Sequence, residues 1–178
     1  MTDEELLVFC ERNEVLWIER EVNGDISIKP IPGCLVSGIS ADILVDLSQW
    51  SDRDGRGEVF SNTGFSLPDG SMLGASVAWL SNEKLSRFTE EDRKGFPHVS
   101  PDFVVEIVGP FDATGDRPEK VAKWLANGAQ VAWLIDPKEK SVTIYRPGDQ
   151  PAHLAHPTSV QGTGPTAGFE LVMSRIWE

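Results

Sequence analysis

Pro101-Asp102-Phe103-Val104-Val105-Glu106-Ile107-Val108-Gly109-Pro110 is the stretch around which this chain is organised. Five of these residues are β-branched or aromatic apolar residues, and proline or glycine stands at both ends, a composition typical of a short buried strand. Glu106 lies near the end of the predicted strand. Because a buried, ionised carboxylate costs several kcal/mol unless a cation or hydrogen-bond donors meet it, Glu106 needs a partner. A metal ion could fill that role, and so could a structural lysine or arginine.

The composition bounds the class of protein. The chain has 178 residues, of which 40% are hydrophobic and 25% charged, so we expect one globular domain over residues 1–178. Its formal net charge of -12 argues against loose electrostatic binding to nucleic acid, although it leaves room for a local basic cleft or a metal site among acidic residues. Cys10 and Cys34 are too few for a disulfide framework, which indicates a reduced, cytoplasmic location. The sequence has no apolar run long enough to span a membrane, and its acidic start is unlike a signal peptide.

The first third of the chain predicts a helix, a hairpin and a second helix. Thr2 and Glu5 form a capping box, so a helix should begin there and end near Asn13. Asn23-Gly24 between the apolar runs 15–20 and 25–30 predicts an antiparallel hairpin. The next helix has an apolar face spaced for packing on a sheet, made of Leu35, Ile39, Ile43, Leu47 and Trp50.

Strands and helices then alternate. Residues 58–60, 65–67 and 72–80 read as strands, residues 81–95 as short helical pieces, 131–136 as a buried strand and 141–146 as its half-exposed partner. A loop at 111–115 precedes a helix that Asp116 and Glu119 should cap and that should end at Gly128. Residues 148–168 should run irregularly over the surface, and Trp177 should pack onto the body. Because the elements are interspersed, we predict an α/β fold with helices packed on one sheet.

The search for chemistry leaves a small set of residues. The sequence has no phosphate-binding glycine loop and no nucleophile elbow. His153 and His156 have no third ligand near them, so a metal site there is not expected. What remains is Glu106 on the central strand and Lys120 on the following helix. A metal-dependent phosphodiesterase needs such parts, because carboxylates hold Mg²⁺ and a lysine orients or stabilises the attacking species.

The order of these elements resembles that of the Uma2-type restriction endonuclease family, a former domain of unknown function within the PD-(D/E)XK nuclease superfamily. The resemblance extends from the first helix to about Phe169. The pieces that carry it are Thr63-Gly64-Phe65, Leu67-Pro68-Asp69-Gly70, Val77-Ala78-Trp79-Leu80, the stretch 101–110, Lys120 with Trp124 and Gly128, and Trp133-Leu134-Ile135-Asp136-Pro137. It implies a restriction-endonuclease-like mixed β-sheet flanked by helices, with an N-terminal helix and hairpin. It also implies a Mg²⁺-dependent (or Mn²⁺-dependent) endonuclease that hydrolyses DNA phosphodiester bonds and forms a homodimer.

The resemblance also assigns roles to individual residues. Glu106 matches the metal-binding acid of the central strand, and the backbone carbonyl of Ile107 is implied as a further metal ligand. Lys120 matches the family's catalytic lysine, which has moved from the strand to the helix; Val108 stands where the superfamily usually has it. Glu19 matches a family glutamate that serves as an extra ligand or supporting group. From the residues alone, Glu19 also reads as a solvated carboxylate near the end of a strand.

This sequence departs from the family at Ser76, where the family has a metal-binding aspartate. A neutral serine is a poor Mg²⁺ ligand. Asp102 is no replacement, because it lies four residues and roughly 13 Å from Glu106 along one strand. We expect Glu106, Ser76 and Lys120 to surround one pocket at a sheet edge, with Glu19 on its rim.

Three interpretations of the function stay open at this point. In the first, the chain is a Mg²⁺-dependent endonuclease. In the second, it is a catalytically inactive nuclease-fold protein that acts as a binding or regulatory module, and in the third, Glu106 and Lys120 form a buried ion pair in a structural domain. Ser76 and the acidic composition favour the second, and the retained Glu106 and Lys120 favour the first.

Overall fold

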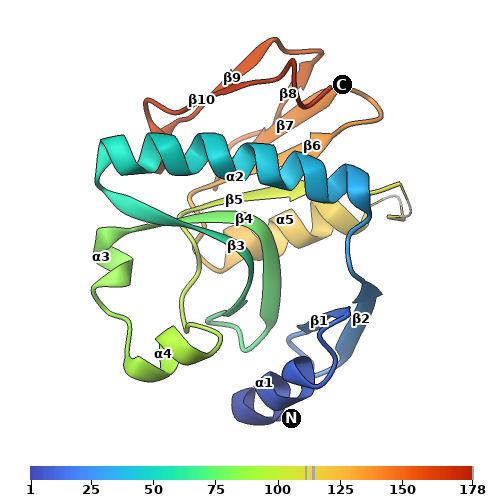
Figure 1. Cartoon of the computed structure of the whole chain (residues 1–178), viewed down its shortest axis with the longest axis vertical. Helices are drawn as coiled ribbons and strands as arrows, with labels where there is room; N and C mark the ends of the chain where they lie inside the picture. Colours follow the sequence, from blue (N-terminus) through green and yellow to red (C-terminus); the bar gives the residue numbers. More distant parts are fainter. Residues whose placement is uncertain (111, 114, 178) are drawn as a thin grey trace.

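The structure, a computed structural model, describes residues 1–110, 112–113 and 115–177 (Figure 1). Its helices are α1 (Asp3–Glu11), α2 (Cys34–Asp54), α3 (Asn82–Leu85), α4 (Glu90–Lys94), α5 (Asp116–Ala126) and the 3₁₀ turn η1 (Gly164–Thr166). Its strands are β1 (Leu16–Arg20), β2 (Ile26–Pro30), β3 (Gly57–Ser66), β4 (Met72–Ser81), β5 (Phe103–Ile107), β6 (Val131–Asp136), β7 (Ser141–Tyr145), β8 (Ala152–Ala155), β9 (Ser159–Gln161) and β10 (Glu170–Val172). Helices and strands alternate along the chain, as the sequence predicted.

Within the described residues, eight strands form one mixed sheet. Its order is β2-β1-β4-β5-β6-β7-β8, and β3 pairs with β4. β5 and β6 run parallel, with Phe103 opposite Val131, whereas the other neighbouring strands run antiparallel. β9 and β10 form a separate two-stranded sheet. The predicted mixed sheet with flanking helices and an N-terminal helix and hairpin is therefore confirmed.

The predicted central strand, β5, is buried along its whole length because a helix covers each face of the sheet around it. Phe103, Val105 and Ile107 belong to the apolar core that includes α2, whereas Val104 belongs to the core that includes α5. Figure 1 shows α2 and α5 on either side of β5. The alternation along the strand places Glu106 on the same side as Val104, toward α5.

The N-terminal helix and hairpin form a smaller part of the molecule. The expected capping box at Thr2 and Glu5 is present at the start of α1. α1 packs on β1 through a small core of Leu6, Ile18 and Met72. In Figure 1 this part lies at one end of the molecule, beyond the long β3–β4 hairpin.

The structure corrects several details of the sequence analysis. α2 turns Val36 into the core, and Leu35 is exposed. Residues 58–60 and 65–66 belong to one continuous strand, β3, because β4 pairs with it from end to end, and Leu67 follows the end of this strand. The irregular segment 148–168 contains β8, which carries His153 and extends the sheet beside β7, and also β9. Trp177 packs against the body as expected, and its Nε1–H donates to the carbonyl of Pro157.

The start of α5 is a further correction. Asp116 is the first residue of the helix rather than its cap, and the preceding residue, Gly115, is the N-cap, with no side-chain hydrogen bond. Gly115 has φ of 101°, which a glycine adopts without strain. The predicted loop at 111–115 includes residues 111 and 114, which lie outside the described part of the chain.

No helix in residues 1–110, 112–113 or 115–177 combines the length and the apolar character needed to cross a membrane.

Candidate functional site

The site lies where the sheet splits. β3 pairs with β4 along one edge, so β1 and β5 share the opposite edge. β1 meets β4 at Met72, and β5 pairs with β4 from Val77 to Trp79. The edge between these points has no neighbouring strand in the described residues, and Gly74 lies in it. Its backbone groups therefore need other partners, because unpaired buried amides and carbonyls are costly.

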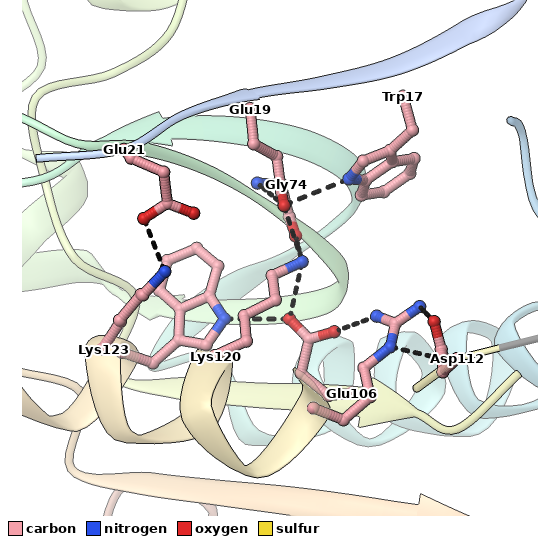
Figure 2. Close-up of polar contacts among 10 residues, drawn as sticks. Trp17, Glu19, Glu21, Gly74, Glu106, Asp112, Lys120 and Lys123 are labelled. Carbon is pink, nitrogen blue, oxygen red and sulfur yellow. Dashed lines mark hydrogen bonds and ion pairs between the residues drawn. The ribbon is translucent and has the colours of Figure 1, made fainter. Parts of the chain in front are cut away.

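Side chains supply those partners. The carboxylate of Glu19 accepts a hydrogen bond of 2.8 Å from the Gly74 amide, and the ammonium of Lys120 donates one of 2.6 Å to the Gly74 carbonyl (Figure 2). Trp17 lies over the same glycine, and its Nε1–H donates to Glu19 over 3.1 Å. A Cβ added at Gly74 would come within 2.5 Å of Trp17 Cζ2, so only glycine fits here. Glu19 and Lys120 thus fill the place of a missing strand.

Lys120 is the hub of the site. Its Nζ lies 2.7 Å from Glu19 Oε1 and 3.2 Å from Glu106 Oε1, so one ammonium joins the two carboxylates (Figure 2). The geometry that brings Glu106 and Lys120 together follows from β5 and α5, which are consecutive and packed on each other. Glu19 comes from β1, and its carboxylate is buried rather than solvated at a strand end.

Glu106 is enclosed on all sides. Its Oε1 also accepts a hydrogen bond of 2.8 Å from Trp124 Nε1, and its Oε2 accepts one of 2.7 Å from Arg117 Nη1. Arg117 is in turn held by Asp112, whose Oδ2 lies 2.7 Å from its Nε. Glu106 has no exposed surface. Protein groups therefore bind both oxygens of this carboxylate, as expected if Glu106 and Lys120 form a buried ion pair.

The charges of this network shift the pKa values of its members. Burial acts to raise the pKa of Glu19, but the charge of Lys120 and hydrogen bonds from Lys120, Trp17 and Gly74 outweigh it, so the pKa lies below its ordinary value. Burial acts to lower the pKa of Lys120, but Glu106 and Glu19 raise it above its ordinary value. Arg117 behaves like Lys120, with Glu106 and Asp112 as its anions. Glu19, Lys120 and Arg117 are thus charged at neutral pH.

A pocket of about 260 Å³ opens beside this network. Ser76, Glu19, Lys120 and Arg117 line it, and Trp17, Lys29, Pro30, Ile31, Pro32, Gly33, Val36, Gly109, Pro110, Asp112 and Asp116 complete the wall. Glu106 lies beneath this wall. The structure thus brings Ser76, Lys120 and Glu106 together where β1 and β5 part along β4. Glu19 is bonded to Lys120 within the network, whereas the sequence placed it on the rim of the pocket.

Two further groups named from the sequence are the carboxylate of Asp102 and the backbone carbonyl of Ile107. Asp102, at the far end of the 101–110 stretch, binds Lys84 over 3.0 Å, Gln130 over 2.7 Å and the Ser81 amide over 2.8 Å. Its carboxylate therefore fixes the neighbouring loops. Ile107 is a buried residue at the end of β5, and its backbone carbonyl as a metal ligand stays a prediction.

The donor groups, as placed, do not fit a Mg²⁺ site. Mg²⁺ takes oxygen ligands in a nearly octahedral arrangement, with one or two carboxylates and several waters. Here a lysine ammonium stands between the two glutamates, an arginine holds the remaining oxygen of Glu106, and residue 76 is neutral. In the described part of the chain, no three His, Cys, Asp or Glu side chains are grouped so that they could hold a metal.

Sequence reasoning missed Arg117 and Asp112. Arg117 precedes Lys120 by three residues, so the two side chains share one face of α5, and this spacing could have indicated a second cation for Glu106. Nothing local marks Asp112, whose contribution depends on the path of the loop between β5 and α5. Lys29 was also missed, since it reaches the pocket from β2.

Comparisons with known proteins agree with this fold. A family model, Uma2, described as "Putative restriction endonuclease", matches residues 3–174. Among solved structures, the chain is similar to "a putative nuclease belonging to DUF820" from Anabaena variabilis ATCC 29413. The TM-score is 0.76 at 20% identity, over 90% of this chain and 89% of the other. That similarity shows a shared fold. No curated protein matches the chain.

Proposed function

The chain belongs to the Uma2 family, and from this premise we propose that it is a nuclease-fold protein that works as a binding module without metal-dependent hydrolysis. One observation carries the proposal. Both oxygens of Glu106 are held by Lys120, Trp124 and Arg117, beside a neutral Ser76 where the family resemblance implies an aspartate.

Charge balance supports this proposal. The carboxylates of Glu19, Glu106 and Asp112 face the cations of Lys120 and Arg117, which leaves one net negative charge in the cluster. A dication would have to compete with two cations that are already hydrogen-bonded. Because removal of either cation leaves a buried carboxylate without its partner, the competition is costly.

A second candidate is the Mg²⁺-dependent or Mn²⁺-dependent endonuclease acting on DNA. The observation that favours it is that Glu19 and Glu106 both contact Lys120, next to an open pocket, so two carboxylates and a lysine do converge. In this version Glu19 supplies the second carboxylate that Ser76 cannot. DNA as a partner and the homodimer remain predictions, which a gel-shift assay and analytical ultracentrifugation can test.

The two candidates differ in plasmid nicking and in metal binding. We expect the wild-type protein to show no saturable Mg²⁺ or Mn²⁺ binding by calorimetry and no metal-dependent nicking. Ser76→Asp restores a carboxylate beside Glu106, so Mg²⁺ should stabilise this variant by about 2.7 kcal/mol at a hundredfold excess over Kd. Ser174→Asp, an exposed serine that does not line the pocket, is the matched control and should show no such gain. Wild-type nicking that disappears in Glu106→Gln would overturn the proposal in favour of the endonuclease.

A further inference from the structure

The hydroxyl of Ser76 faces the pocket without a partner. The residue is 6% exposed, it lines the pocket, and no hydrogen bond joins its Oγ to the described residues. Ser66, Ser100 and Trp133 hold the sealed side-chain polar atoms without partners in the described residues, whereas Ser76 Oγ is open to the pocket. The hydroxyl is therefore free to donate a hydrogen bond to a group bound there.

The N-terminus of α2 opens on the same pocket. Gly33 is the N-cap and Val36 is in the first turn, and both line the pocket wall. The cap has no side-chain hydrogen bond, and a Cβ added at Gly33 would meet nothing within 4 Å. The first amides of a helix of 21 residues carry unpaired N–H groups and the positive end of the helix dipole, which favours an anion.

Lys29 adds a charge to this part of the pocket. It lines the wall from β2, and within the described residues it forms no ion pair. Its field reaches Asp112, whose pKa burial acts to raise but Arg117, the Gly109 amide and Lys29 together lower. The three carboxylates of the neighbouring network exceed its two cations by one charge, which Lys29 offsets. Asp116, an exposed carboxylate without an ion pair among the described residues, opposes the binding of an anion.

We infer that this pocket binds a phosphate group, held by the Ser76 hydroxyl, the Lys29 ammonium and the first amides of α2. The inference rests on the proposed function, since it gives the binding module its ligand class. The pocket, about 260 Å³, is smaller than the roughly 300–1,000 Å³ of typical drug-sized sites, which suits a phosphomonoester. The phosphate can belong to a small metabolite or to the 5′ end of a nucleic-acid strand.

NMR titration of the full chain with inorganic phosphate, in buffer with EDTA, tests the inference. We expect saturable amide shifts at Gly33, Cys34 and Val36. Lys29→Gln should weaken binding about tenfold and Ser76→Ala about threefold, because each removes one donor to a charged acceptor. Asp116→Asn should tighten binding, since it removes the opposing charge. Lys94→Gln is the control for charge loss, because Lys94 is exposed and lies outside the pocket.

Further arms of the titration identify the source of the phosphate. Ribose 5-phosphate and a 5′-phosphorylated tetranucleotide are compared with ribose and the unphosphorylated tetranucleotide. Tighter binding of either phosphorylated form supports the site and names its ligand. The inference is overturned if phosphate causes no saturable shifts, or if Lys29→Gln and Lys94→Gln weaken binding equally. Because the titration excludes metal, its failure leaves the nicking result unaffected, and nicking activity with intact phosphate binding would refute only the proposed function.

Discussion

The ammonium of Lys120 donates its hydrogen bond of 2.6 Å to the backbone carbonyl of Gly74, a residue 46 positions earlier in the chain. A side chain of α5 thereby completes the backbone bonding of β4 at the point where β1 and β5 part. The same amine joins Glu19 to Glu106. Lys120 therefore has a structural role that can be measured without any assay of hydrolysis.

Replacement of Lys120 by methionine should be strongly destabilising. Lys120→Met keeps the length of the side chain but leaves Glu19 and Glu106 buried without their shared cation, so we expect a loss of about 3–5 kcal/mol in the free energy of unfolding. Urea denaturation at pH 7 measures it. Lys123→Met is the control on the same helix, because its partner Glu21 is 32% exposed and such pairs contribute at most about 1 kcal/mol. Equal losses in the two variants would contradict the central position of Lys120.

Glu19 should make the free energy of unfolding decrease as the pH falls into the acid range. Its pKa in the folded protein is lowered from the ordinary value of 4.5, so its stabilising contribution is present above that value and is lost as the pH falls through the folded pKa. Between about pH 6 and pH 3, the free energy of unfolding should therefore fall more steeply for the wild type than for Glu19→Gln, which takes up no proton. Urea denaturation over a pH series gives both curves. Parallel curves would show that Glu19 is not held as a buried carboxylate.

Gly74→Ala should disturb the site through sterics alone. The new Cβ would lie 2.5 Å from Cζ2 and 2.8 Å from Cε2 of Trp17, so the indole must move and Glu19 loses a donor. Overpacking of this kind costs about 1–3 kcal/mol. Gly38→Ala is the matched control, because nothing lies within 4 Å of its added Cβ and alanine favours the helix by about 0.5–1 kcal/mol. Thermal unfolding should thus move in opposite directions for the two variants.

His98 should make the free energy of unfolding depend on pH near neutrality, whereas Glu19 does so in acid. Its imidazole lies 2.8 Å from Asp3 of α1 and 3.1 Å from Asp92 of α4, and hydrogen bonds to these two carboxylates raise its pKa above 6.5. The stabilisation is therefore present below the unfolded pKa and is lost as the pH rises through the raised value. Because His98 is 64% exposed, we expect less than about 1 kcal/mol.

NMR titration of the His98 ring and urea denaturation between about pH 6 and pH 8 check this prediction. His98→Asn should remove the pH dependence in that range, whereas His153→Asn, in β8, should retain it. A ring that titrates at or below the ordinary value would show that Asp3 and Asp92 do not hold the protonated form.

The parts of the fold that sequence reasoning predicted correctly are those with local signals. The Thr2–Glu5 capping box, the Asn23-Gly24 turn and the apolar run of β5 each depend on residues close in the chain, and each is present. The proximity of Glu106 and Lys120 also follows from local order, because β5 leads directly into the helix that packs on it. The errors at Leu35 and Asp116 arose because neighbouring residues satisfied the same pattern equally well.

The sequence by itself determined that a carboxylate would be buried on the central strand and that it would need a cation. Only the tertiary structure decided which groups meet it, because those groups depend on where β1 leaves β4. Glu19 reaches Gly74 across 55 residues and Lys120 reaches it across 46, and neither separation has a periodic or compositional signal. The edge of Gly74 that faces away from β3 has no strand beside it in the described residues, and its amide and carbonyl select these side chains because buried backbone groups require partners.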